Sequence, residues 1–380
     1  MSKTVFILGA GASFEGGGPL MGNFLEVADT LRHSPRIGTY RDRAGKEHAY
    51  REDFDRVFKA RAQLQPVHSK AALDLYNLES VFGAFEMAKR FRKNFGSLNT
   101  DEVANLSQSM RRLIMRSLEL TMRFVMSDGL TLTDRLRLPH PYGQFGLFLH
   151  NLAKTTSVSI ITFNYDIAVD STLWKYKLQA DYCLEKEPLG SGVPLMKLHG
   201  SINWTWCERC KRIAAWPLKD FFDKYLSRWQ PDHPGPLRPD PASGFTAVEI
   251  ASWMDQFIDA CGEHMMAGSA AIVPPTWEKT DYSAGFENIW AHAANHLAEA
   301  ENIVVIGYSL PPTDQFFPIL YALGTVSETI LKRFWVFDPD DTGAVRKRFQ
   351  EMLGPAAKQK FQFRQETFGS AIGFLGSQLW

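Results

Sequence analysis

The chain has 380 residues, of which 45% are hydrophobic, so it is long enough for a main domain and at least one inserted segment. Its 42 basic residues balance its 42 acidic ones, and zero net charge indicates neither nucleic acid nor a membrane surface as a partner. No run reaches the roughly 18 to 20 apolar residues that cross a bilayer. With four cysteines and an N-terminal apolar run too short for a signal peptide, we expect a cytoplasmic protein with reduced thiols.

The first half of the chain predicts one strand followed by a helical insertion. Residues 5–8 are apolar and run into a glycine cluster, which is typical of a buried strand entering a tight turn. Residues 32–61 are charged, rich in arginine and only weakly periodic. Residues 70–93 and 101–127 space their apolar side chains like one face of a helix, so we expect two long helices there.

The second half returns to short strands. Residues 157–163, 194–198, 302–306 and 333–337 are apolar and rich in β-branched or aromatic side chains, so each predicts a strand. Residues 229–244 contain five prolines, which exclude a helix or a central strand and indicate an exposed loop. Strands separated by helices predict an α/β fold.

Each of the five predicted strands ends in small or polar residues. These clusters read Gly-Ala-Gly-Ala-Ser at 9–13, Asn-Tyr-Asp at 164–166, His-Gly at 199–200, Gly-Tyr-Ser at 307–309 and Asp-Pro-Asp at 338–340. In open α/β sheets, ligands bind beyond the carboxyl ends of the strands. Loops are polar in any protein, so one such cluster decides little, whereas five together favour a ligand site.

The residues after the first strand can form a phosphate-binding turn. Gly9 and Gly11 would let the backbone approach a diphosphate at a helix N-terminus, and Ser13 would add a hydroxyl. The dehydrogenase fingerprint has a third glycine where this chain has Phe14, and no strand ending in an acidic residue follows about 20 positions on. The loop therefore predicts nucleotide binding without a hydride-transfer arrangement. The alternative is a glycine turn that serves only packing.

Three side chains at later strand ends can carry chemistry. His199 is a candidate general base because imidazole titrates near neutral pH. Asn164 cannot accept a proton at neutral pH, so it would position a water or a ribose hydroxyl, as Asp166 also could. A lone histidine is more often structural, but the adjacent glycine and the other strand-end clusters favour a functional His199.

Two cysteine-containing segments can form a metal site. Cys207 and Cys210 are spaced as Cys-x-x-Cys, and Cys261 with His264 would complete a tetrahedral Cys₃His zinc site. The gap between the two pairs is long for a zinc ribbon, so free thiols are the alternative.

These fragments together resemble the sirtuin superfamily. The matching segments, in the family's order, are GAGAS at 9–13, TFNYD at 162–166, KLHGSINW at 197–204, the Cys-x-x-Cys pair at 207–210, IGYSLPPTD at 306–314 and FDPD at 337–340. The resemblance implies a Rossmann-like, mostly parallel sheet with helices on both faces, a small and often zinc-containing module, and NAD⁺ as the ligand. We expect the sheet domain at 1–30, 135–204 and 265–380, the helical insertion at 31–134 and the small module at 205–264.

The resemblance also implies roles for particular residues. The NAD⁺ phosphates would be held by the glycine loop, that is by Gly9, Ala10, Gly11, Ala12 and Ser13. Asn164 and Asp166 would line the nicotinamide-ribose pocket, and His199 would be the catalytic base. The adenosine half would contact Gly307, Ser309 and Asp338.

Two departures from the sirtuin deacylases indicate a different branch of the family. The Pro-Asp-Phe-Arg stretch that closes over nicotinamide is absent, since residues 14–20 read FEGGGPL, and the family's TQNID becomes TFNYD. Both fit the prokaryotic branch of NAD⁺ hydrolases in anti-phage defence by abortive infection, as does the helical region around residues 77–82. Since we see no appended sensor or Argonaute-type domain, we expect a homo-oligomer that is partnered with a HerA-type ATPase.

Three functions fit these residues. The first is hydrolysis of NAD⁺ to nicotinamide and ADP-ribose, with Asn164 placing the water, His199 taking a proton and any zinc being structural. The second passes the ribose carbon to an acyl-lysine or protein nucleophile, as a deacylase or an ADP-ribosyltransferase does. The third is a non-catalytic subunit that binds NAD⁺ or ADP-ribose, against which the retained pair of Asn164 and His199 argues.

Overall fold

The structure, a computed structural model, describes residues 2–379 except 69–72, 95, 188, 274–282, 313, 315 and 326–328. The chain divides into two compact units. The sheet unit comprises Met1–Gly18, Arg123–Gly200 and Trp277–Trp380, and the second unit comprises Pro19–Met122 and Ser201–Thr276. Most of the predicted helical insertion and all of the predicted small module fall within the second unit.

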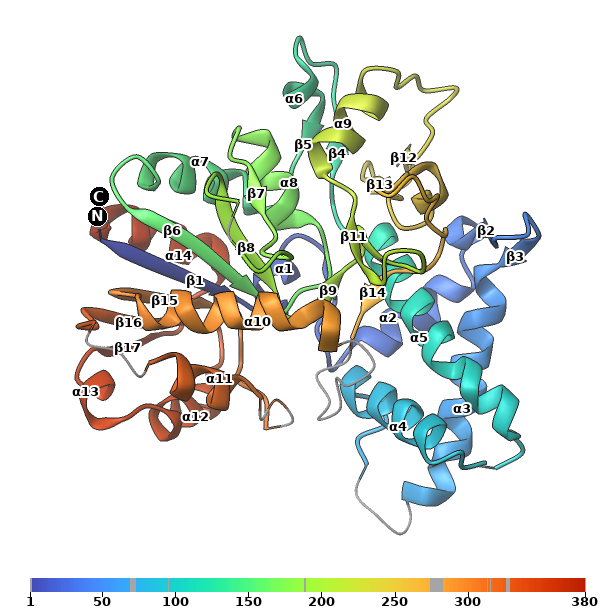
Figure 1. The fold of residues 1–380 in the computed structure, drawn as a ribbon, viewed down its shortest axis with the longest axis horizontal. Helices are drawn as coiled ribbons and strands as arrows, with labels where there is room; N and C mark the ends of the chain where they lie inside the picture. The colour runs from blue at the N-terminus through green and yellow to red at the C-terminus, as the bar shows by residue number, and fades with distance from the viewer. Residues whose placement is uncertain are drawn as a thin grey trace. The chain divides into compact units, whose positions relative to one another are not determined.

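The sheet unit is built on a seven-stranded parallel sheet (Figure 1). In spatial order the strands are β17 (Phe361–Arg364), β16 (Arg333–Phe337), β15 (Asn302–Ile306), β1 (Lys3–Leu8), β6 (Ser157–Thr162), β8 (Val193–Lys197) and β7 (Ala180–Asp181). The five predicted strands and the Rossmann-like α/β fold class are confirmed. The sequence did not predict β7, which has two residues, or β17, a partly exposed edge strand.

Helices cover both faces of this sheet (Figure 1). They include α7 (Tyr142–Leu152), α8 (Ala168–Lys175), α10 (Ser283–Ala298), α11 (Phe316–Gly324), α12 (Ala344–Met352) and α14 (Phe368–Gln378). Phe334 of β16 packs against Tyr321 of α11 and Phe349 of α12. The next residue, Trp335, packs against Phe374 of α14. Consecutive strand residues point to opposite faces, so α11 and α12 cover one face and α14 covers the other.

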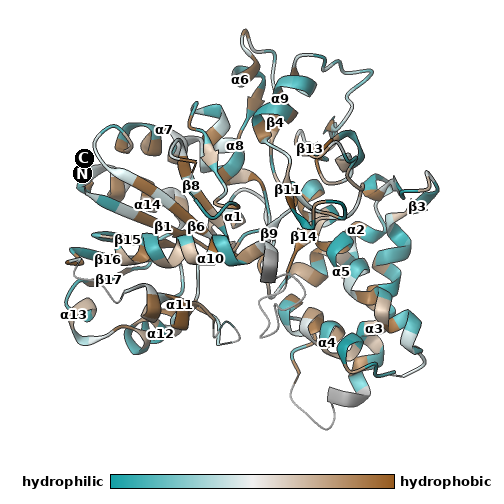
Figure 2. Ribbon diagram, in the orientation of Figure 1, coloured by the Kyte–Doolittle hydropathy of each residue, from teal (hydrophilic) through white to brown (hydrophobic). Residues whose placement is uncertain are grey.

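Aromatic side chains fill the layer beneath α7 and α14. Phe6 of β1 contacts Phe145 and Phe148 of α7, with ring centroids 5.6 and 6.0 Å apart. Phe145 also contacts Phe368 of α14, so α7 and α14 share a face. Hydrophobic residues follow one another along the central strands (Figure 2), which is why uninterrupted apolar runs predicted them. None of the helices in the described part of the chain combines the length and the apolar character needed to cross a bilayer.

The second unit contains helices packed around α5. They are α2 (Phe24–Arg32), α3 (Tyr50–His68), α4 (Leu78–Arg90) and α5 (Thr100–Thr121), and α5 packs against the other three. Asn77 caps α4 by accepting hydrogen bonds from two backbone amides, and Asn99 forms a capping box with Glu102 at the start of α5. The caps begin these helices at 78 and 100, and both end earlier than predicted, at 90 and 121. Residues 70–72 of the first predicted helix lie outside the described residues.

Helix α3 lies in the segment whose apolar periodicity is weak. Its buried residues Tyr50, Phe54 and Val57 have helical spacing, but the buried Asp53 interrupts them. The Asp53 carboxylate accepts a hydrogen bond from the Tyr40 hydroxyl at 3.1 Å and, through its other oxygen, from Arg56 of the same helix and Ser109 of α5. Because this buried position is charged, the apolar periodicity of the sequence does not predict the helix.

Short antiparallel ladders complete the second unit. They pair β2 (Thr39–Arg41) with β3 (Glu47–Ala49), β10 (Trp204–Cys207) with β11 (Arg212–Ala215), and β12 (Leu237–Pro239) with β13 (Thr246–Val248). The prediction of an exposed loop over residues 229–244 is therefore wrong at β12. Proline is tolerated there because β12 lies at the edge of a two-stranded ladder.

Arg116 of α5 is buried between two carboxylates, and its removal should destabilise the protein. Its Nη1 lies 3.0 Å from Glu119 and 2.9 Å from Glu249, and both carboxylates are buried. Arg116→Ala would leave Glu119 without a cationic partner and Glu249 with only the exposed Arg238, so we expect the free energy of unfolding to fall by about 3–5 kcal/mol. Urea denaturation measures this loss. Lys219→Ala removes an exposed pair with Asp223 and should leave stability near wild type; equal losses in both variants would contradict the prediction.

Candidate functional site

The five polar clusters lie along one edge of the sheet. Strands β16, β15, β1, β6 and β8 are consecutive parallel neighbours, so their carboxyl ends meet at the same edge. The chain order reverses at β1, which pairs with β15 on one side and β6 on the other. In open α/β sheets, a reversal of this kind opens a crevice in which ligands bind.

The glycine loop packs directly against the loop that follows β15. The amide of Gly9 donates to the Ile306 carbonyl at 3.1 Å, and that of Gly11 donates to the Gly307 carbonyl at 2.8 Å. A Cβ on Gly11 would lie 2.8 Å from the Gly307 Cα, and a Cβ on Gly307 would lie 2.2 Å from the Ala12 nitrogen. The close approach of two main chains therefore accounts for these glycines by itself. Because carbonyls occupy the amides of Gly9 and Gly11, neither is free to donate to a phosphate.

Asn164 lies just beyond β6, and its side chain is held in one orientation. Its Nδ2 donates to the Gly9 carbonyl at 2.8 Å and to Ser13 Oγ at 2.9 Å. A carbonyl oxygen can only accept, so these contacts fix which end of the amide faces the glycine loop. Asn164 Oδ1 has no hydrogen-bond partner among the residues that the structure describes. It is therefore the atom left for a water or a ligand.

Ser13 connects Asn164 to Asp166 and Tyr142. Its Oγ lies 2.6 Å from Asp166 Oδ2 and 2.9 Å from the Tyr142 hydroxyl. Because Asn164 donates to Ser13 and a carboxylate can only accept, Ser13 donates to Asp166 and accepts from Tyr142. Burial raises the pKa of Tyr142 well above its ordinary value, which keeps this donor protonated. Ser13 thus supports the loop after β6 with a hydroxyl that the resemblance had assigned to NAD⁺ phosphates.

Asp166 is buried, and both of its carboxylate oxygens are engaged. Oδ2 accepts from Ser13, and Oδ1 accepts from the Ala168 amide at 2.9 Å. Burial raises the pKa of the Asp166 carboxyl, and the nearby Lys197 ammonium and these hydrogen bonds oppose the rise. The carboxylate therefore shapes the loop that carries Asn164.

His199 lies just beyond the end of β8, and Asn164 lies just beyond the end of the neighbouring strand β6. These strands pair with Thr162 opposite Lys197, so each residue lies two positions beyond that pair. Because these strands are parallel neighbours, Asn164 and His199 both follow the carboxyl edge of the sheet. The side chain of His199 is buried, with the ring of Phe163 edge-on to the imidazole at 5.3 Å.

An aromatic wall stands beside His199. Phe163 stacks on Tyr308 with ring centroids 4.1 Å apart, and Phe317 meets both rings edge-on. The Tyr308 hydroxyl donates to Asp314 at 2.6 Å, which fixes the ring on the loop after β15. The wall limits access of water to this side of the imidazole.

The residues expected to bind the adenosine half lie beyond β15 and β16. Gly307 belongs to the close main-chain contact, and the carbonyl of Ser309 accepts from Arg348 Nε at 2.9 Å. Asp338 is 9% exposed, and burial raises the pKa of its carboxyl. Its Oδ1 accepts from the Asp340 amide at 3.0 Å, while Oδ2 has no partner within the described ranges. That oxygen can accept a hydrogen bond from a ribose hydroxyl.

In the second unit, three cysteines converge with Asp259. One ligand atom from each of Cys207, Cys210, Asp259 and Cys261 lies within 4.8 Å of the others. The sulfurs of Cys207 and Cys261 are 3.5 Å apart, and Cys210 Sγ lies 3.2 Å from Asp259 Oδ2. Three thiolates and one carboxylate at these separations suit a tetrahedral zinc ion.

The structure places Asp259, and not the expected His264, beside the three cysteines. His264 is exposed, and its Nδ1 lies 3.3 Å from the Asp255 carbonyl. It pairs with Ile258 across a tight turn, within which the Asp259 amide donates to the Glu263 carbonyl at 2.9 Å. This turn keeps Asp259 with the cluster and holds His264 outside it.

We expect the purified chain to hold about one zinc ion at this cluster. Asp259→Ala should weaken zinc binding by at least about 10-fold, the loss seen even for groups that only support a ligand. His264→Ala should keep wild-type affinity, since His264 lies outside the cluster. Competition with a chromogenic chelator measures both affinities. Loss of zinc from His264→Ala, with retention in Asp259→Ala, would contradict this ligand set.

Three residues of the strand-end site were not predicted from the sequence. Tyr142 opens α7 and lies 129 positions from Ser13, and no motif marks it. Lys197 and Asp170 form a buried ion pair. A signal for this pair exists, because a lysine inside an apolar strand must find a buried partner.

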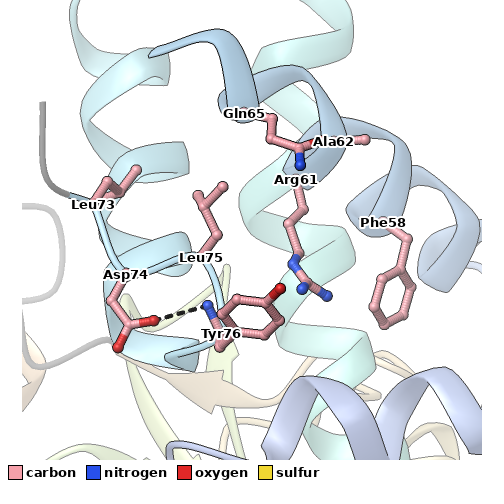
Figure 3. Close-up of a pocket in the computed structure, with 8 residues that line it drawn as sticks. All are labelled: Phe58, Arg61, Ala62, Gln65, Leu73, Asp74, Leu75 and Tyr76. Carbon is pink, nitrogen blue, oxygen red and sulfur yellow. Dashed lines mark hydrogen bonds between the residues drawn. The ribbon is translucent and has the colours of Figure 1, made fainter. Parts of the chain in front are cut away.

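A surface cavity of about 760 Å³ lies in the second unit and contains none of the strand-end residues (Figure 3). Its lining comes from α3 and from residues 73–76: Phe58, Arg61, Ala62, Gln65, Leu73, Asp74, Leu75 and Tyr76. The Arg61 guanidinium lies 5.0 Å from the centre of the Tyr76 ring. The Tyr76 side chain is 71% exposed, and Asp74 is also exposed, so the cavity is an open surface feature and lacks the buried polar groups of the strand-end site.

No protein-family profile and no curated protein sequence matches the chain. Among solved structures, it is similar to a Sir2 homologue in complex with ADP-ribose, with 13% identity, a TM-score of 0.40, and coverage of 99% of this chain and 91% of that one. It is also similar to Sir2 with a p53 peptide and NAD⁺ and to Sir2Tm bound to a propionylated peptide. Each of these has 11% identity, a TM-score of 0.36, and coverage of 99% of this chain and 92% of the other.

Proposed function

We propose that this chain is a sirtuin-like NAD⁺ glycohydrolase, which cleaves NAD⁺ to nicotinamide and ADP-ribose. The observation that carries the proposal is that Asn164 and His199 follow two neighbouring parallel strands, each two residues beyond the paired Thr162 and Lys197. Gly9 and Ser13 hold the Asn164 amide, so its Oδ1 has a fixed direction. Asn164 follows β6, the neighbour of the strand β1 at which the strand order reverses, and nucleotides bind near such reversals.

The proposed reaction breaks the bond between the nicotinamide nitrogen and the ribose C1 atom. As in other glycosidic cleavages, positive charge develops on the ribose as nicotinamide leaves with the bonding electrons. Asn164 Oδ1 accepts a hydrogen bond from a water molecule and directs its oxygen to C1. His199 takes a proton from that water or from a ribose hydroxyl. The hydroxyl of the water joins the ribose, and one proton is released for each NAD⁺ consumed.

The rest of the dinucleotide would lie along the sheet edge toward β16. The glycine loop lies beside this path, but the main chain of residues 307–308 fills the space next to Gly9 and Gly11, so the diphosphate would not contact these two residues there. At the end of β16, Asp338 Oδ2 would accept a hydrogen bond from a ribose hydroxyl of the adenosine half. Ser309 follows β15, the strand between β1 and β16, and would contact the same half. The buried Asp338 carboxylate supports this placement because it has one unengaged oxygen.

Zinc at the cysteine cluster would be structural. Three thiolates and the Asp259 carboxylate would fill all four positions of a tetrahedral ion, so none is open to a substrate. The ion would tie Cys207, at the end of β10, to the turn that carries Asp259 and Cys261.

On the resemblance of its motifs, we propose that the chain depletes NAD⁺ in anti-phage defence, as a homo-oligomer with a HerA-type ATPase. Uncontrolled NAD⁺ hydrolysis would be toxic, so assembly with the partner would control activity. Deacylation and ADP-ribosyl transfer would use the same pocket with another acceptor. The divergent sequence at 14–20 argues against deacylation.

The products formed with and without an acetyl-lysine peptide test the proposal. A glycohydrolase yields nicotinamide and ADP-ribose in equal amounts, at a rate that does not depend on the peptide. NAD⁺ consumption that requires the peptide, with acetyl-ADP-ribose as a product, would show a deacylase. Intact NAD⁺ together with measurable ADP-ribose binding would show a binding subunit.

A further inference from the structure

Lys197, the last residue of β8, is buried with its charge inside the sheet unit. Its side chain is 1% exposed, and its Nζ donates to the Asp166 main-chain carbonyl at 2.5 Å and to Asp170 Oδ2 at 2.8 Å. Asp170 on α8 is equally buried, and its other oxygen accepts from the Tyr182 hydroxyl at 2.8 Å. Burying a charged pair costs desolvation free energy that an apolar pair avoids, so stability alone does not favour a lysine here.

The Lys197 side chain joins the two loops that carry the proposed reacting pair. His199 lies two residues beyond Lys197 on one loop, and Asp166 lies two residues beyond Asn164 on the other. The Lys197 ammonium, at the end of the strand that leads to His199, therefore holds a main-chain carbonyl of the loop that carries Asn164. Lys197 contacts the main chain of Asp166, so the hydrogen bond does not depend on which side chain stands at position 166.

We propose that Lys197 is a positioning residue, whose hydrogen bond to the Asp166 carbonyl sets the separation between Asn164 and His199. The inference rests on the proposed NAD⁺ cleavage, because that reaction requires a particular separation between Asn164 and His199. Lys197 acts through the loop and touches no substrate. Asp170 is its counter-ion and allows the ammonium to stay charged in the interior.

The competing explanation is that Lys197 and Asp170 form an ion pair that serves only stability. The two explanations use different atoms, since one concerns the Asp170 carboxylate and the other the Asp166 carbonyl. A variant that removes both charges together separates them, because it leaves no charge at Asp170 but still lacks the donor to the Asp166 carbonyl. The Asp166 carboxylate loses the nearby ammonium in both variants and keeps its hydrogen bonds from Ser13 and the Ala168 amide.

The test compares Lys197→Met with the double variant Lys197→Met/Asp170→Asn. The single variant leaves Asp170 unpaired and should melt at a lower temperature than wild type. The double variant should melt close to wild type, while kcat for nicotinamide release falls by about 10- to 100-fold with little change in KM for NAD⁺. Tyr182→Phe removes a bond to the same carboxylate and keeps the Lys197 contact, so its kcat should match wild type.

Hydrogen exchange supplies a readout that does not depend on NAD⁺. In the double variant, amides of residues 164–168 should exchange at least about 10-fold faster than in wild type, with those of β1 unchanged. Lys197→Leu/Asp170→Asn serves as a second version if the methionine version does not fold, since leucine also lacks a donor. If wild type releases no nicotinamide either alone or with a HerA-type ATPase and DNA, the proposed function fails, and hydrogen exchange of the loop alone tests the role of Lys197. Wild-type turnover and wild-type loop exchange in the double variant would overturn the inference.

Discussion

His199→Gln is expected to lower kcat for nicotinamide release by about 10²- to 10⁴-fold, the usual contribution of a general base. Glutamine cannot take a proton near neutral pH. Its size is close to that of histidine, so contacts with the rings of Phe163 and Tyr165 should largely survive. Liquid chromatography measures nicotinamide release, and calorimetry measures ADP-ribose binding, which should persist.

His150→Gln is the matched control for this variant. His150 lies on α7, with its Nδ1 3.2 Å from the Tyr176 carbonyl, and it belongs to none of the strand-end clusters. Its turnover should match wild type. A His199→Gln protein that still turns over NAD⁺ at the wild-type rate would remove His199 from the role of base.

Asn164→Asp is expected to reduce kcat/KM by about 10²- to 10³-fold, the loss typical of removing one fixed polar group from an active site. The shape of the side chain is kept, but an acceptor replaces Nδ2, which now donates to Gly9 and Ser13 at 2.8 and 2.9 Å. Two acceptors cannot hydrogen-bond, and a second negative charge would adjoin Asp166. The side chain should rotate and lose the direction of Oδ1.

Asn288→Asp controls for the general cost of this substitution. Asn288 on α10 also donates its amide to a carbonyl, that of Leu184, at 2.8 Å, but it is not part of a strand-end cluster. Its kcat/KM should remain near wild type even where stability falls. Equal losses in turnover by Asn164→Asp and Asn288→Asp would mean that Asn164 contributes only to folding.

The central strands were predictable because a parallel sheet buries both of its faces. β1 and β15 read as unbroken apolar runs, which few other structures explain. The strand β7 could not be predicted, since two residues carry no periodicity. Helix α3 was missed for another reason: Asp53 is charged yet belongs to the core, where Tyr40 and Ser109 from outside the helix donate hydrogen bonds to it.

The polar residues at the strand ends predicted which edge of the sheet holds the candidate site, but not the role of each residue there. Gly9 and Gly11 suggested phosphate binding, whereas the structure uses them to pack against Gly307. Ser13 suggested a ligand hydroxyl, whereas its hydrogen bonds go to other side chains. Such assignments depend on residues far away in sequence, which local motifs do not contain.

The fourth residue of the metal cluster shows the same limit. Spacing favoured His264 because histidine is a common zinc ligand. The turn between Ile258 and His264 decides otherwise, since it brings Asp259 and Cys261 to the cluster together. Turn geometry of this kind becomes visible only once the chain is folded.

The most direct measurement is nicotinamide release from NAD⁺ by the purified wild-type chain, made alone, with a HerA-type ATPase, and with that ATPase and DNA. We predict nicotinamide and ADP-ribose in equal amounts, without an acylated peptide, in at least one of these three conditions. The same condition with His199→Gln should give almost none. Intact NAD⁺ in all three conditions would contradict the proposed hydrolysis.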